Sequence, residues 1–103
     1  MEVSSSYILR GIRSYKNEYY FPPQANWPKH QFKKRCYEEW AIEEVERRIL
    51  EHPTWDPVII AEEFYKEAAA CLKKTNNNAN EELFTIVVET LGQLVDYLHC
   101  MCK

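Results

Sequence analysis

Glycine is almost absent from the chain, which has only two glycines, Gly11 and Gly92, among its 103 residues. Phosphate-binding loops of the Rossmann and Walker types need several closely spaced glycines, so the sequence excludes both. Sheet-rich folds also usually need more turn residues than this. Because 46% of the residues are hydrophobic, the scarcity of glycine predicts one compact all-α domain that spans residues 1–103.

The sequence also lacks a long apolar run. No stretch approaches the roughly 18 uninterrupted apolar residues of a membrane-spanning helix, and the mean hydropathy is −0.55. The first residues do not resemble a secretion signal, because Glu2 and a serine run occupy the place of its basic and apolar regions. We therefore expect a cytoplasmic protein with no membrane partner, whose four cysteines are reduced thiols.

No group of residues predicts catalysis or metal binding. The four serines and three histidines are scattered, so no nucleophile stands beside a base. His99, Cys100 and Cys102 are close in sequence, but a helix points His99 and Cys100 about 100° apart, and the usual Cys-x-x-Cys step of zinc sites is absent. We expect no enzyme activity, no cofactor, no metal and no small-molecule substrate.

One pair of carboxylates suggests a weaker alternative. Glu43 and Glu46 are three residues apart on a predicted helix, as are the magnesium ligands of the all-helical MazG nucleotide pyrophosphohydrolases. The second step of that family, Glu-x-x-Asp on the next helix, is missing. A MazG-like magnesium-dependent hydrolase is therefore only the third hypothesis.

The net charge of −3 divides unevenly along the chain. Residues 1–35 have a net charge of +5, and residues 36–103 have a net charge of −8. Seven aromatic residues accompany the basic third, and cations with flat rings suit phosphates and unpaired bases. A nucleic-acid-binding accessory protein is therefore the second hypothesis. Its expected contacts are Arg10, Arg13, Lys16, Lys29, Lys33, Lys34 and Arg35.

Apolar spacing predicts three long helices, over about residues 28–51, 57–74 and 81–101. Asp56 followed by Pro57 is a strong start signal for the middle one, and Asn78 or Asn80 is expected to cap the last. In the first of these helices, Phe32, Cys36 and Trp40 line a side with no evident partner among the later helices. We expect the N-terminal segment to pack there.

The aromatic-rich N-terminal segment is ambiguous. Ile8, Ile12, Tyr15 and Tyr19 would share one face of a helix capped by one of three consecutive serines, 4–6. The same β-branched and aromatic residues between 7 and 21 would also suit a short hairpin. We prefer the helix, followed by an extended connection over residues 20–27.

The last predicted helix has an apolar arc of about 200°, which one neighbouring helix cannot cover. Either this helix lies at the centre with partners on two sides, or part of the arc is buried against a second copy of the chain. In the second case the exposed part would include some of Phe84, Ile86, Val88 and Val95.

The C-terminal half carries a faint resemblance. The tract Trp55-Asp56-Pro57-Val58, then Glu62-Glu63-Phe64, and a last helix reading Phe84-Thr-Ile-Val-Val and Leu94-Val-Asp-Tyr-Leu, resembles small uncharacterised helical proteins of prophages and mobile elements of low-GC Gram-positive bacteria. That resemblance implies no activity. Our first hypothesis is a small cytoplasmic helical protein that acts by protein–protein interaction, with homodimerisation through the last helix as its specific form.

Overall fold

The computed structural model describes residues 4–20, 24–75 and 78–102, apart from the side chains of residues 78 and 79. Within these ranges the chain forms four helices and no strand. The all-α class is therefore confirmed, with three long helices after a shorter first one. The helices are α1 (Ser5–Tyr19), α2 (Lys29–Glu51), α3 (Pro57–Lys74) and α4 (Asn78–Met101).

The N-terminal segment is a helix and not a hairpin. Ser4 caps α1, because its hydroxyl accepts a hydrogen bond from the backbone N–H of Tyr7 at 3.1 Å. Ile8, Ile12 and Tyr15 are buried along one face, so burial of this face outweighs the strand propensity of the same residues. No described helix is long and apolar enough to cross a membrane.

The starts of the other helices differ in how well the sequence marks them. Asp56 caps α3 as expected, and its carboxylate accepts a hydrogen bond from the N–H of Val58 at 2.9 Å. In contrast, α2 follows Pro28 without a side-chain cap. The helix α4 already begins at Asn78, three residues before the predicted start. Asn80 therefore lies inside the first turn and does not cap the helix.

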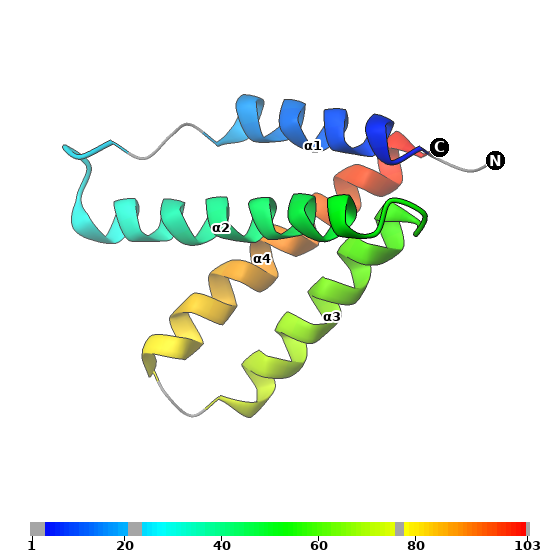
Figure 1. Ribbon diagram of the computed structural model, residues 1–103. Coiled ribbons are helices and arrows are strands. Elements are labelled where there is room, and N and C mark those ends of the chain that lie inside the picture. The colour runs from blue at the N-terminus through cyan, green and yellow to red at the C-terminus, as the bar shows by residue number, and fades with distance from the viewer. Residues whose placement is uncertain (1–3, 21–23, 76–77, 103) are drawn as a thin grey trace.

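Helix α4 lies at the centre of the molecule. It forms an antiparallel hairpin with α3, crosses behind α2, and ends beside the start of α1 (Figure 1). Of the four helices, it makes the most extensive contacts with the other three. The wide apolar arc is thus covered largely from within the chain, which is the first of the two arrangements predicted. The largest fully buried side chains come mainly from α1, α2 and α4 and include Ile8, Ile12, Ile42, Ile49, Leu91, Leu94 and Leu98.

Helix α1 does not cover the aromatic side of α2, contrary to the prediction. Trp40 is 50% exposed, and its ring meets the edge of Phe64 on α3, with the centroids 6.1 Å apart. Helix α1 lies instead along a different face of α2, where Lys16 bonds Glu43 at 3.1 Å. The outer face of α2 is left open to solvent.

The two glycines lie in different packing environments, and a stability prediction follows. A methyl group added at Gly92 would meet Tyr65 at 3.5 Å, an ordinary contact, whereas one at Gly11 would overlap the side chain of Met101. We expect Gly92→Ala to raise the free energy of unfolding by about 0.5–1 kcal/mol, because alanine favours a helix interior. Urea denaturation measures this gain, and Gly11→Ala, the matched control, should show less of it or none.

Candidate functional site

Large apolar side chains are exposed mainly around α2 and α3. Of the seven that are exposed among the described residues, five belong to α2, to α3 or to the link between them. These five are Phe32, Trp40, Leu50, Trp55 and Ile59. Single exposed apolar residues are ordinary, and these five are spread along α2 and the start of α3, so only neighbours such as Trp55 and Ile59 belong to one surface patch.

A groove lies where α2 and α3 diverge from the link that joins them. The two helices form the arms of a V, with α4 behind it (Figure 1). The groove has a volume of about 650 Å³, and Trp55 and Ile59 on its wall are 57% and 52% exposed. We call this site the α2–α3 groove. Its lining residues are Arg47, Arg48, Glu51, His52, Trp55, Asp56, Ile59, Ile60, Glu63 and Glu67.

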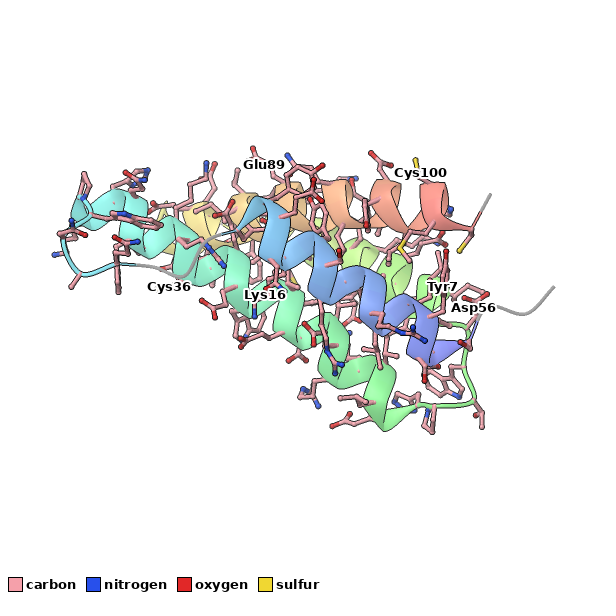
Figure 2. All side chains as sticks on the ribbon, turned by 90° about the horizontal axis from the view of Figure 1, so that it is seen from above. Tyr7, Lys16, Cys36, Asp56, Glu89 and Cys100 are labelled. Carbon is pink, nitrogen blue, oxygen red and sulfur yellow. The ribbon has the colours of Figure 1, made fainter. Side chains whose placement is uncertain are left out.

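The link between the helices fixes the closed end of the groove. The rings of His52 and Trp55 are stacked, with centroids 3.6 Å apart and planes 6° apart, and the N–H of Trp55 bonds the carbonyl of His52 at 3.1 Å. The hydroxyl of Ser5 donates to the carbonyl of Pro53 at 3.3 Å, which ties the link to α1. Figure 2 shows Asp56 and Tyr7 at this same end of the molecule. The exposed ring of Trp55 is therefore held in a fixed position by its contacts with His52 and by the link.

An ion network holds the wall that α2 contributes. Arg47 donates to Glu44 and Glu51 within α2. Arg48 bonds Glu67 on α3 at 2.8 Å and Glu44 at 3.2 Å, and its guanidinium lies over the ring of Phe64 at 4.1 Å. Hydrogen bonds from Arg47 hold the pKa of Glu44 below its ordinary value. Arg48 thus bridges the two arms of the V.

The charge of the groove is acidic. Its lining contains four carboxylates and two guanidiniums, and both guanidiniums are already bonded to glutamates. Asp56 and Glu63 have no basic partner within the lining. The nearest cation to Glu63 is Lys66 at 3.6 Å, on the same helix, and both side chains are largely exposed. A negative field therefore remains around Trp55 and Ile59.

The residues expected to contact nucleic acid do not form one free basic surface. Lys16 pairs with Glu39 and Glu43 on α2, and Lys33 pairs with Glu82 on α4 at 3.6 Å. Arg13 approaches Glu46 at 3.7 Å. Much of the positive charge of residues 1–35 is thus paired with glutamates from residues 36–103 of the same chain. Within the described part of the chain, no ion pair forms at Arg10, Lys29 or Lys34.

Arg35 is buried, and its contacts lie inside the protein. It is 5% exposed, donates to the carbonyl of Tyr20 at 3.2 Å, and stacks its guanidinium on the Tyr20 ring at 5.2 Å. The Tyr20 hydroxyl in turn donates to Gln93 on α4 at 3.3 Å. Burial, together with a hydrogen bond to Tyr15, raises the pKa of Tyr20 above its ordinary value. Arg35 therefore lies outside any surface that a phosphate can reach.

The residues expected to mediate self-association are only partly accessible. Ile86 is buried within the chain, which removes it from the expected exposed part of the arc. Phe84, Val88 and Val95 are half-buried, and Val88 and Val95 pack against the core. The apolar surface that α4 offers to a second copy is therefore smaller than the sequence predicts.

Several residues considered as metal or hydrolase ligands form ion pairs with other side chains. Among the described residues, no three histidine, cysteine, aspartate or glutamate side chains converge. His99 pairs with Glu62 at 2.6 Å, while Cys100 is exposed on the outer side of α4 (Figure 2). Glu43 and Glu46 each pair with a cation of α1.

These features define a class: an all-helical protein with an acidic, apolar-walled groove between two diverging helices. No protein-family model matches the chain, and no curated protein or solved structure is found to be similar to it. A helical architecture by itself assigns no activity. The α2–α3 groove is therefore the feature that bears on function.

Proposed function

We propose that this protein is a helical accessory protein that binds another polypeptide chain in the α2–α3 groove. The exposure of Trp55 and Ile59 in one groove carries the proposal. Aromatic side chains in an apolar recess ringed by charges are typical of the centres of protein interfaces. Leaving these two side chains in water forgoes about 25 cal/mol for each Å² of apolar surface, which a bound chain would recover.

The groove supports this function better than the other surfaces do. The arc of α4, through which homodimerisation was expected, is covered largely by α1, α2 and α3. The basic residues of α1 and α2 pair with glutamates at several points, which weakens their attraction for phosphates. A smaller recess on the α4 surface is lined by Tyr65, Val88 and Val95, but these side chains are partly buried, whereas Trp55 and Ile59 are exposed.

Selection from a random peptide library displayed on phage tests the proposal, because such a library covers many sequences and needs no named partner. We expect selected peptides to bind the unmodified protein and to lose about tenfold or more in affinity for Ile59→Asp, because the aspartate places an unpaired charge against the apolar wall. Calorimetry of synthesised peptides measures the loss.

Leu50→Asp is the matched control for this experiment. Leu50 is exposed on α2 but does not line the groove, so the control carries the same kind of charge without altering the site. Peptides that bind both variants as tightly as the unmodified protein would contradict the proposal, and so would a selection that yields no binding peptide.

A further inference from the structure

Resting on the proposed function, we infer that the α2–α3 groove takes a basic amphipathic helix from a different protein. Such a helix presents apolar side chains at intervals of three and four residues, with lysine or arginine beside them. The apolar side chains would meet Ile59 on the groove wall, and the cations would meet the carboxylates of the rim. Charge, the surroundings of Trp55 and the shape of the groove each support this occupant.

The charge of the groove selects the sign of the occupant. Four carboxylates and two guanidiniums line it. Arg47 and Arg48 are held by Glu44, Glu51 and Glu67, so they are poor partners for an added anion. Asp56 and Glu63 lie on the α3 side with no cation of the lining opposite them. A basic segment would be attracted to this rim, whereas an acidic one would be repelled.

Trp55 adds a second preference for cations. One face of its indole ring is stacked on His52, and the side chain is still 57% exposed. The indole ring is the best aromatic partner for an ammonium or guanidinium group. Asp56 follows Trp55 directly in the chain, so a cation over this ring would also lie near a carboxylate.

The shape of the groove suits a helix. Its α3 wall extends from Asp56 to Glu67, a length of about 17 Å along a helix axis. The opposite wall is also helical, and the two arms diverge (Figure 1). A third helix of about three turns would fit along the α3 wall and contact both arms.

A pair of synthetic peptides tests the inference. Both have about 14 residues and the same leucines at helical spacing, and they differ only in carrying lysines or glutamates at the flanking positions. We expect the lysine peptide to bind about tenfold or more tightly than the glutamate peptide in calorimetry at low salt, with the difference falling as salt is raised. Equal affinities, or tighter binding of the glutamate peptide, would overturn the inference.

Charge-reversal variants locate the effect. Glu63→Lys should weaken binding of the lysine peptide about fivefold or more, because it turns a rim carboxylate into a cation. Glu18→Lys makes the same change on α1, at an exposed position outside the groove, and should leave the affinity unchanged. Equal losses in both variants would show attraction to the whole protein and would overturn the assignment to the groove.

The remaining outcomes separate this inference from the proposed function. Groove-binding peptides from the phage library that are acidic or uncharged would overturn the inference and leave the proposed function standing. Failure of any peptide to bind the groove would overturn both.

Self-association of the unmodified chain in sedimentation equilibrium that is lost in Ile59→Asp would overturn the inference by identifying a second copy as the occupant. Binding of spermidine as tight as that of the lysine peptide would also overturn it, by reducing the site to one for free cations.

Discussion

Leu91→Ala is expected to lower the free energy of unfolding by about 2–5 kcal/mol, since the change removes a buried side chain and leaves a cavity. Leu91 has no exposed surface and lies on α4, the helix with the most extensive contacts to the other three. Neighbouring helices cannot all move inward to fill the space. Domains of this size are stable by about 5–15 kcal/mol in total, so the loss is a large part of the whole, and urea denaturation measures it.

Leu50→Ala is the control for this prediction. It makes the same chemical change at a leucine that is 61% exposed, so the stability should change by no more than about 0.5 kcal/mol. If Leu91→Ala cost as little as Leu50→Ala, α4 could not be the centre of the core.

Arg35→Ala is expected to cost about 2–4 kcal/mol of stability, because it removes a buried charge-assisted hydrogen bond and the packing of a long aliphatic stem. The guanidinium holds the carbonyl of Tyr20, the residue that ends α1, against α2. Its loss should therefore loosen the end of α1 as well. Thermal unfolding measures the stability, and amide hydrogen exchange of α1 reports the local effect.

Lys34→Ala provides the comparison for Arg35→Ala. Lys34 is the exposed neighbour of Arg35 on α2, and its removal should alter stability by about 0.5 kcal/mol or less. A similar loss in the two variants would mean that positive charge in this part of α2 matters in general. It would contradict a specific role of Arg35 at Tyr20.

Helix starts were predictable where the local chemistry is unambiguous. Asp56 and Pro57 combine a side-chain cap with a preset backbone angle, and α3 begins where they predict. The start of α4 was predicted three residues late, because asparagine favours caps in general but Asn80 lies within the helix here. For α1, propensity left helix and hairpin open, and tertiary burial of Ile8 and Ile12 decided between them.

The groove could not be predicted from the sequence, because it depends on the angle between two helices. The apolar spacing of α2 predicts a core stripe of Tyr37, Ala41, Ile42, Val45 and Ile49; the last four are buried, and Tyr37 is only partly buried. Arg35 was missed because an arginine does not look like a core residue. Trp55 was equally uninformative, since the sequence does not show whether another helix covers it. One available signal was Ile59 itself, which falls on the polar side of α3.

The central position of α4 also bears on how the protein folds during synthesis. α4 is the last of the four helices to leave the ribosome, and the side chains Leu91, Leu94 and Leu98 that it supplies have no exposed surface in the native fold. Until they emerge, the apolar face of α3 lacks the helix on which most of it packs. In proteins most of the stability of a helix comes from the tertiary packing of its apolar face. We therefore expect the nascent chain to complete its core only once α4 has emerged.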